Sequence, residues 1–567
     1  MKLTRPVSRL NEDFDVVVVG GGVTGVTVAR EAACRGLRVA LLDRGDFGAE
    51  TSSATSKLIH GGIRYLEQYD FAVVRESLRE RRILALGAPH LVRQTRFIMP
   101  AWRWSKPPTL LIGAGVLLYD ALSYDRNREA PPSLRINHPR WMSRKALRRA
   151  VPWLDDDQLQ GAFAYQDTMN VHPERLLLAY AKSAAEAGAV LINHMNVTGF
   201  VHDTIGLTLS VQGVTATDLL SGEQHRVRAR VVVNAAGPWI DSVLSTLGRS
   251  TGVGVDRSKG VHLLTRPLGG PGRVTDAVFA RAKSGRHVIV SPWMGKSFIG
   301  PTDTPLGSDT ATVEKTDVVE ILETINSTMA KDQTPLTVDD VSLTTVGVRP
   351  LIRTGDDEAK GTYSASRRHE LYHHTDKGVE NLWSIGGGKW TTGRASAEEM
   401  VDELFANELR DKTTAPWSSR RATAAGAFAW AQDAEPYLRR GVETLRAAGM
   451  GVRSAEHVVR LYGTEHVVIA EMAESDPSLG QVLDPTSVSA DVGAQVLYAV
   501  THEGARTLSD IVDRRLTLGT VGPIGANVFS RVAALAGPAL GWDAQRQSDE
   551  VVREVACRAL IESRWRD

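Results

Sequence analysis

The sequence is poor in cysteine and in net charge. Its two cysteines, Cys34 and Cys557, lie near opposite ends of 567 residues. They cannot supply a disulfide framework or a cysteine-rich metal site, and so few thiols fit a reducing, cytoplasmic compartment. We therefore expect no metal. The 67 Lys and Arg against 66 Asp and Glu leave a formal charge of +1, which gives no electrostatic case for a nucleic-acid partner.

Long apolar runs are also missing. No stretch reaches the roughly 18 apolar residues of a membrane-spanning helix, and the polar first 12 residues predict no secretion signal. The best apolar run, residues 109–118, is about half a span. No D-x-[DN]-x-[DN]-G pattern predicts a calcium-binding loop.

The length and the pattern of elements indicate several domains. Residues 411–426 are polar and turn-rich, like a linker, and the sequence beyond them is Ala-, Glu- and Arg-rich with helical patterns. We predict an α/β protein with a Rossmann-like nucleotide-binding domain in residues 1–410 and an all-α domain in residues 411–567. An antiparallel-sheet cap domain is expected as insertions at about 95–165 and 245–345, because residues 260–304 are strand-like and punctuated by Gly and Pro.

The first 43 residues predict a dinucleotide-binding βαβ unit. Residues 14–20 are a buried-strand pattern, 23–35 are helical and 37–43 form a second strand. Between strand and helix, Gly20, Gly22 and Gly25 match G-x-G-x-x-G, where glycine permits a tight turn, the approach of a pyrophosphate and close helix–strand packing. Asp43 ends the second strand, where a carboxylate can bind a ribose. NAD and FAD share this motif, so it leaves the dinucleotide open.

Other elements can be placed more coarsely. Helices are expected at residues 67–88 and 173–187 and from 391 onward, and strands at 197–214, 224–234 and 382–388.

Three later segments carry small residues of the kind that lie close to a ligand. Residues 51–65 (TSSATSKLIHGGIRY) combine hydroxyls and glycines, which suit a backbone beside a flat ring but fit a polar surface loop equally well. Residues 231–241 (VVVNAAGPWID) are a strand that ends in small residues. The glycines at 386–388 and Lys389 precede a helix, whose free N–H groups would stabilise negative charge. Taken alone, either of the last two fits a simple turn.

Together these motifs resemble the FAD-dependent glycerol-3-phosphate dehydrogenases. Five segments occur in the family's order: the glycine fingerprint, residues 51–67, VNAAGPWID, VGVRPL at 346–351 and GGGKWTT at 386–392. The most specific of these runs is SKLIHGGIRYLE. Residues 506–516 are similar to the family's C-terminal domain, whereas Trp390 and Gly393 stand where the family usually has Leu and Tyr. The resemblance implies that FAD is held by Gly20, Gly22, Gly25, Asp43, Thr51, Ser52, Ser53, Ser56, Lys57, His60, Gly61, Gly62, Ala236, Gly237, Gly388, Lys389, Trp390 and Thr391.

The resemblance also implies a reaction: oxidation of sn-glycerol 3-phosphate at C2 to dihydroxyacetone phosphate, with the hydride passed to the flavin. By similarity, Arg64, Arg349 and Arg367 would hold the substrate, because a guanidinium makes bidentate bonds to phosphate. Arg368 is adjacent, so the alignment leaves the third arginine open by one position.

His262 and Lys389 both match site positions of the family that could supply the base. By the same resemblance, Tyr65 would lie near the flavin. His262 is favoured over Lys389, because a histidine titrates near neutral pH unaided and a lysine serves only with a strongly depressed pKa.

The family delivers its electrons to a membrane quinone from the cytoplasmic face of the membrane, which implies the same partners here; a homodimer is a further hypothesis. Residues 102–120 combine Trp102, Trp104, Arg103 and Lys106 with an apolar run, which fits a segment in the membrane interface and equally a buried helix of the cap domain. The basic run at 140–149 is better interpreted as a solvated face. A glycerol-3-phosphate oxidase using O2 is the alternative function, and an amino-acid oxidase or a non-catalytic flavoprotein fits the motifs less well.

Overall fold

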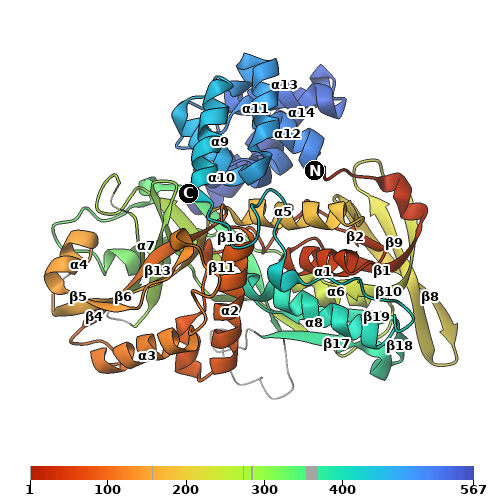
Figure 1. Cartoon of the computed structure of the whole chain (residues 1–567), viewed down its shortest axis with the longest axis horizontal. Coiled ribbons are helices and arrows are strands. Elements are labelled where there is room, and N and C mark those ends of the chain that lie inside the picture. Colours follow the sequence, from red (N-terminus) through yellow and green to blue (C-terminus); the bar gives the residue numbers. More distant parts are fainter. Residues whose placement is uncertain (1, 156, 273, 283–284, 353–367, 567) are drawn as a thin grey trace.

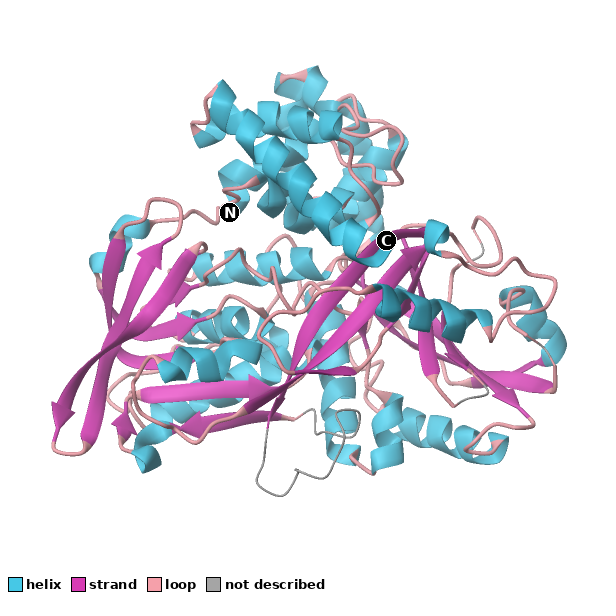
Figure 2. Cartoon of the chain, turned by 180° about the vertical axis from the view of Figure 1, so that it is seen from behind, coloured by secondary structure: helices cyan, strands magenta, loops and turns pink. Residues whose placement is uncertain are grey.

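The computed structural model describes residues 2–566 except 156, 273, 283–284 and 353–367. Two large sheets lie side by side, and a group of helices from the C-terminal part of the chain covers one edge of both (Figures 1 and 2). The N-terminus reaches this helical group, because Leu3 N donates a hydrogen bond of 2.8 Å to His502 O.

The first sheet has a parallel core in the order β19-β10-β1-β2-β7, with β17 added antiparallel at its edge. Strand β1 lies in the middle of this sheet, and its valines are buried on both faces of the sheet. Val16 and Val18 face the layer of helices, whereas Val17 and Val19 face the β8–β9 hairpin. The elements of this part are β1 (Asp13–Val19), α1 (Val23–Cys34), β2 (Val39–Leu42), α5 (Pro173–Glu186), β7 (Val190–Ile192), β8 (Met195–Ile205), β9 (Thr208–Asp218), β10 (Gln224–Asn234), α6 (Ile240–Ser245), β17 (His369–His373), β18 (Val379–Glu380), β19 (Leu382–Gly387) and α8 (Gly393–Ala406).

The second sheet is mostly antiparallel and follows the order β15-β11-β14-β13-β12-β4-β6-β3, with β16 paired to β11 and β5 to β6. Helices α2 and α3 lie on one of its faces and α4 and α7 on the other. Its elements are β3 (Leu58–Ile59), α2 (Phe71–Gly87), β4 (Val92–Trp102), α3 (Thr109–Leu122), β5 (Arg140–Ser143), α4 (Arg144–Ala150), β6 (Leu159–Asn170), β11 (Val255–Thr265), β12 (Ala277–Arg281), β13 (His287–Trp293), β14 (Lys296–Gly300), β15 (Thr304–Leu306), α7 (Lys315–Asn326) and β16 (Val341–Ile352).

The helix expected at 67–88 begins later than the pattern suggested. Residues Ile63–Gln68 form a 3-10 helix, and Tyr69 has a φ of +58°, which an α-helix cannot contain. Asp70 then accepts a hydrogen bond from Val73 N and starts α2 at Phe71.

The C-terminal helices are α9 (Glu435–Ala447), α10 (Val452–Tyr462), α11 (His466–Ser475), α12 (Gly493–Glu503), α13 (Ala526–Leu540) and α14 (Ala544–Arg566). Their apolar faces enclose two cores of their own. Helix α14 extends beyond them, and its Trp565 is buried in the core between α7 and the second sheet.

Helix α3 has two different faces. Gly113, Val116 and Tyr119 are buried against the second sheet, whereas Leu110, Leu111, Leu117 and Leu118 are exposed. The interpretation of this segment as a buried helix is therefore wrong for its outer face. The expected interfacial role of the tryptophans is wrong as well, because Trp102 is buried and stacks on Trp104 inside the domain. No helix among the described residues is long and apolar enough to cross a bilayer.

Candidate functional site

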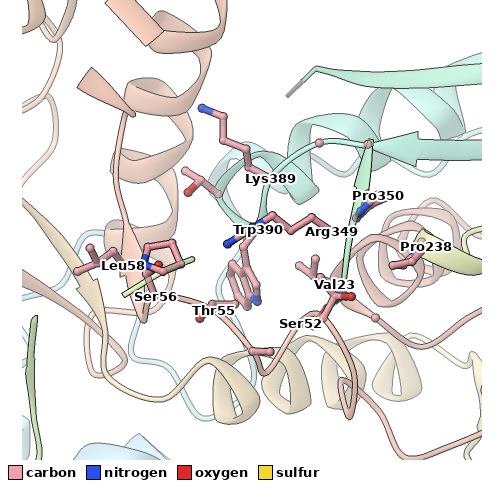
Figure 3. Close-up of a pocket in the computed structure, with 18 of the residues that line it drawn as sticks. Val23, Ser52, Thr55, Ser56, Leu58, Pro238, Arg349, Pro350, Lys389 and Trp390 are labelled. Atoms are coloured by element: carbon pink, nitrogen blue, oxygen red, sulfur yellow. Dashed lines mark hydrogen bonds between the residues drawn. The ribbon is translucent and has the colours of Figure 1, made fainter. Parts of the chain in front are cut away.

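One cavity of about 1360 Å³ collects most of the predicted site residues. It is lined from the glycine turn after β1 at one end to the outer residues of α3 at the other. Figure 3 shows its middle, where Trp390 and Arg349 approach from the two sheets and Ser52, Thr55 and Ser56 approach from the loop before β3. Arg349 belongs to β16 and the loop before β3 crosses from the first sheet to the second, so the cavity lies between the two sheets.

The glycine turn is built as its motif predicts. Gly20 has a φ of +105°, and a Cβ there would lie 2.7 Å from Ala235 O. A Cβ on Gly25 would overlap Gly20 O, so this glycine serves helix–strand packing and does not line the cavity. The Asp43 carboxylate accepts hydrogen bonds from Gly21 N and, at 2.7 Å, from Gly45 N. Burial raises the pKa of Asp43.

Some residues of the loop at 51–65 line the cavity, and others only hold the loop in place. Ser52 Oγ accepts a hydrogen bond of 2.9 Å from Val23 N at the start of α1, and Thr51 Oγ1 donates one of 2.6 Å to Val348 O. Ser53 is different, because its hydroxyl donates to Glu50 O at 2.9 Å.

Several residues predicted to contact the cofactor lie outside the cavity lining. Lys57 is buried, with Nζ 2.7 Å from a Glu174 carboxylate oxygen. Gly61 and Gly62 are packing positions, because a Cβ would collide with Tyr119 on Gly61 and with the Tyr65 ring on Gly62. Within the described part of the chain, the predicted cofactor residues absent from the lining are Gly25, Ser53, Lys57, Gly61 and Gly62, and those present in it are Gly20, Gly22, Asp43, Thr51, Ser52, Ser56, His60, Ala236, Gly237, Gly388, Lys389, Trp390 and Thr391.

His262 lies on β11 and lines the cavity. Its Nε2 is hydrogen-bonded to Ser56 Oγ at 2.9 Å, its ring stacks on Phe298, and its Nδ1 is buried with no hydrogen-bond partner among the described residues. Burial lowers the pKa of His262 to about 3, and the charges of Arg349 and Lys57 act in the same direction. The imidazole is therefore neutral at physiological pH, and the titration near neutral pH that its residue type suggests does not occur.

Lys389 follows β19 at the start of a 3-10 helix. Its Nζ donates to Ser77 Oγ at 2.7 Å and lies 4.2 Å from the centre of the Tyr65 ring. Figure 3 shows this side chain directed away from Trp390. Burial lowers the pKa of Lys389 to about 8, which is far enough for a minor fraction to be neutral at pH 7.

Arg349 on β16 lies across its neighbouring strand, and a Cβ on Gly260 of β11 would collide with its guanidinium. Arg349 NH1 is 3.0 Å from Asp303 Oδ1, and NH2 donates to Thr302 O at 2.9 Å. The sequence alone did not reveal Asp303, because it follows a Gly-Pro pair in a loop with no motif of its own. Its carboxylate fixes one edge of the guanidinium beside the cavity.

A second group of residues, two arginines and a histidine, lines the same cavity. The Arg64 guanidinium lies 5.2 Å from the centre of the Tyr65 ring. Arg281 and His287 face each other across β12 and β13, and burial lowers the pKa of His287 to about 4, helped by Arg281 and Arg64. Neither residue carried a sequence signal, because the pairing of two strands brings them together.

The third predicted arginine cannot be placed. Arg367 lies outside the described residues. Arg368, the alternative left open by the sequence, pairs with Asp70 at 2.8 Å and does not line the cavity.

Comparison with known proteins decides the family. The protein-family model described as "FAD dependent oxidoreductase" matches residues 15–403, and the family model described as "C-terminal domain of alpha-glycerophosphate oxidase" matches residues 418–547. A glycerol-3-phosphate dehydrogenase of Synechocystis sp. is 34% identical over 557 residues, which cover 96% of each chain. The chain belongs to the glycerol-3-phosphate dehydrogenase family. Glycerol-3-phosphate dehydrogenase 2 of Mycobacterium tuberculosis is also 34% identical, over 96% of this chain and 87% of that protein.

The family's fold is also seen in a solved structure. A glycerol-3-phosphate dehydrogenase from Bacillus halodurans, complexed with FAD, has a TM-score of 0.74 over 97% of this chain and 95% of that one, at 24% identity. These comparisons confirm the predicted α/β fold with its helical C-terminal domain, the FAD cofactor and the assignment as an FAD-dependent enzyme of this family.

The cavity of this family member fits FAD on its own features. Gly22 opens the N-terminus of α1 to the cavity, where N–H groups and the helix dipole favour a pyrophosphate. The Asp43 carboxylate lies at the same end, as a ribose requires. The backbone of Gly387 and Gly388 has φ values of +71° and +78°, which lets the chain turn sharply from β19 into the 3-10 helix beside the cavity. Beside it, Trp390 Nε1 is buried and has no partner among the described residues.

Proposed function

We propose that this protein oxidises sn-glycerol 3-phosphate at C2 to dihydroxyacetone phosphate. The observation that supports this most directly is that Arg349 and His262 line one cavity together with the dinucleotide fingerprint. An arginine held by Asp303 beside the cavity suits a phosphate, and the relatives at 34% identity are named glycerol-3-phosphate dehydrogenases. Bound FAD supplies the acceptor for the hydride of C2.

The side chains then divide the remaining tasks. Arg349 and Arg64, which line the same cavity, would bind the phosphate and so orient C2. His262, which is neutral and lines the cavity, would take the proton of the C2 hydroxyl, and Ser56 is hydrogen-bonded to its Nε2. Lys389 is the second candidate, because burial has lowered its pKa to about 8. Its contacts with Ser77 and the Tyr65 ring instead suit a fixed positive charge.

We also propose a membrane quinone as the electron acceptor, reached from the cytoplasmic face of the membrane. Four exposed side chains line the cavity at one end: Tyr69, Phe71, Leu111 and Leu118. Leu110 and Leu117 of α3 are exposed beside them, at 87% and 64%. This apolar rim fits a surface that enters the headgroup region, so that an apolar acceptor can reach the cavity without crossing water.

A homodimer is supported by the last helix. Helix α14 turns Glu550 and Glu554 inward, whereas Val552 and Leu560 are 64% and 57% exposed. In an antiparallel pair centred on Ala556, Val552 would face Leu560 of the partner subunit, and Asp549 would lie near the oppositely charged end of that helix. Light scattering on Leu560→Glu tests this: a monomeric variant beside a dimeric wild type supports the pair, and an unchanged mass contradicts it.

The central test is anaerobic addition of sn-glycerol 3-phosphate to the purified yellow protein. Bleaching supports the substrate and the cofactor together, and an unchanged spectrum contradicts the proposal. Mixing the bleached protein with air or with a soluble quinone then identifies the acceptor. Rapid recovery of colour with quinone, and slow recovery with little peroxide in air, would support the dehydrogenase; rapid peroxide formation would favour the oxidase.

A further inference from the structure

A buried carboxylate joins the C-terminal helical domain to the cofactor cavity. Residues 43–46, the turn that follows β2, all line the cavity. The last of them, Asp46, accepts hydrogen bonds from Arg514 Nε at 2.6 Å and from both terminal nitrogens of Arg515. Both arginines belong to the C-terminal domain, in the helical turn Asp510–Arg515.

The opposite end of the same short turn holds the glycine fingerprint. Asp43 accepts from Gly21 N and Gly45 N, and Gly48 N donates to Gly21 O at 3.0 Å. Because only two residues separate Asp43 from Asp46, we expect a shift of Asp46 to displace the carboxylate expected to bind the ribose.

Two further contacts fix this turn to the helical domain. His194 N donates to Gly45 O at 2.7 Å, and His194 Nε2 is hydrogen-bonded to Asp510 Oδ2 at 2.9 Å. Asn193 Nδ2 bridges Asp46 Oδ1 and Gly504 O, at 3.0 and 3.1 Å. Asp46, His194 and Asp510 lie close enough together to suggest a metal site, but guanidinium groups already face both carboxylates, which leaves no case for a cation.

The free-energy cost of burying these charges suggests that the ion pairs serve to position the turn at residues 43–46. The side chains of Asp46 and Arg515 are fully buried, and a buried ion pair is often no more stabilising than well-packed apolar residues. It does fix geometry, because paired guanidinium groups accept only a narrow range of carboxylate positions.

We propose that the C-terminal helical domain retains FAD by holding the turn at residues 43–46 in place through Arg514 and Arg515. Asp46 is then a positioning residue for the adenosine end of the cofactor. The proposal does not depend on the substrate or the electron acceptor. It depends on Asp43 contacting the cofactor, as its motif predicts.

The chain offers a control across the same interface in Glu503, whose backbone carbonyl accepts from Arg515 at 2.8 Å but whose carboxylate pairs with other cations. The Glu503 side chain is also fully buried, with its carboxylate 2.5 Å from Arg175 NH1 and 3.7 Å from Lys182 Nζ, and it does not line the cavity. Asp46→Asn and Glu503→Gln each replace a buried carboxylate that faces two cations with an amide of the same shape. Both should lower the Tm, because both leave buried charge unpaired.

The experiment is titration of the full-length apoprotein of each variant with FAD, followed by quenching of flavin fluorescence. We expect Asp46→Asn to raise the Kd for FAD at least tenfold and Glu503→Gln to leave it within about twofold, a split that loss of stability alone would not produce. Arg514→Gln and Lys182→Gln form a second pair in case a first variant does not fold, with a weaker FAD complex expected only for Arg514→Gln. If FAD affinity falls equally within a pair, or is unchanged in both of its variants, the proposal is wrong.

Discussion

The identity of the base can be read from the pH dependence of kcat/KM, because the two candidates have widely separated pKa values. That of His262 is about 3 and that of Lys389 about 8. A base loses activity as pH falls through its pKa, and kcat/KM reports the free enzyme. With His262 as the base, the imidazole stays neutral from pH 9 to 5 and contributes no acid limb. With Lys389 as the base, activity falls about fivefold between pH 8 and 7 and about a further tenfold by pH 6.

The measurement is a series of initial rates at low substrate concentration from pH 5 to 9, with an artificial dye as acceptor. The second ionisation of a phosphate ester lies near pH 6, so the interval from pH 7 to 8 is the diagnostic one. We expect a flat profile there, and a loss of about 10²–10⁴ in kcat for His262→Ala with FAD retained. Ser56→Ala should give a smaller loss, because it only releases the imidazole ring. A profile that falls from pH 8 to 7, with near-normal kcat in His262→Ala and a large loss in Lys389→Met, would refute the assignment to His262.

Four other predictions concern separate parts of the protein. Arg349→Ala should raise KM at least tenfold for glycerol 3-phosphate and much less for glycerol, because it removes charge-assisted hydrogen bonds worth about 1.5–3 kcal/mol each; equal effects on both substrates would remove its role at the phosphate. Gly22→Val should give a colourless protein, and stoichiometric FAD in that variant would contradict the fingerprint. Serine at Leu110, Leu111 and Leu117 should release the protein from lipid vesicles in a flotation assay while dye-linked activity survives; persistent flotation would exclude α3 as the attachment site. Lys57→Met should cost about 3–5 kcal/mol by urea unfolding, because it leaves Glu174 buried without its main cation. Burial alone would raise the pKa of Glu174, but Lys57 and His172 lower it to about 2. The Glu174 carboxylate therefore stabilises the wild type above about pH 4.3, and this contribution is lost as pH falls toward 2. A Lys57→Met variant as stable as the wild type at pH 7 would contradict this role of the ion pair.

The sequence predicted those parts of the site whose contacts are local. The turn at Gly20 to Gly25 and the carboxylate of Asp43 belong to one βαβ unit, so spacing alone placed them. Residues that depend on distant segments were not predicted: Asp303 meets Arg349 only when two strands and a loop assemble, and Arg514 is 468 residues from Asp46.

The local errors have local physical causes. The start of α2 was misplaced because the amphipathic pattern continues through Tyr69, whose left-handed backbone interrupts the helix. The tryptophans at 102 and 104 suggested a membrane interface by composition, which does not distinguish an aromatic pair stacked inside a domain from one at the surface.

The burial of Trp565 has a consequence for how this protein is made. The core that receives it also contains Ile98 of β4 and Val261 of β11, so part of the packing of the second sheet is supplied by helix α14, which follows every strand of that sheet in the sequence. During synthesis, the apolar core of this sheet is incompletely packed until helix α14 has been translated and has docked against it. Truncation before residue 565 would therefore leave a cavity in the core of a distant domain, and we expect such a chain to be recognised by chaperones and proteases.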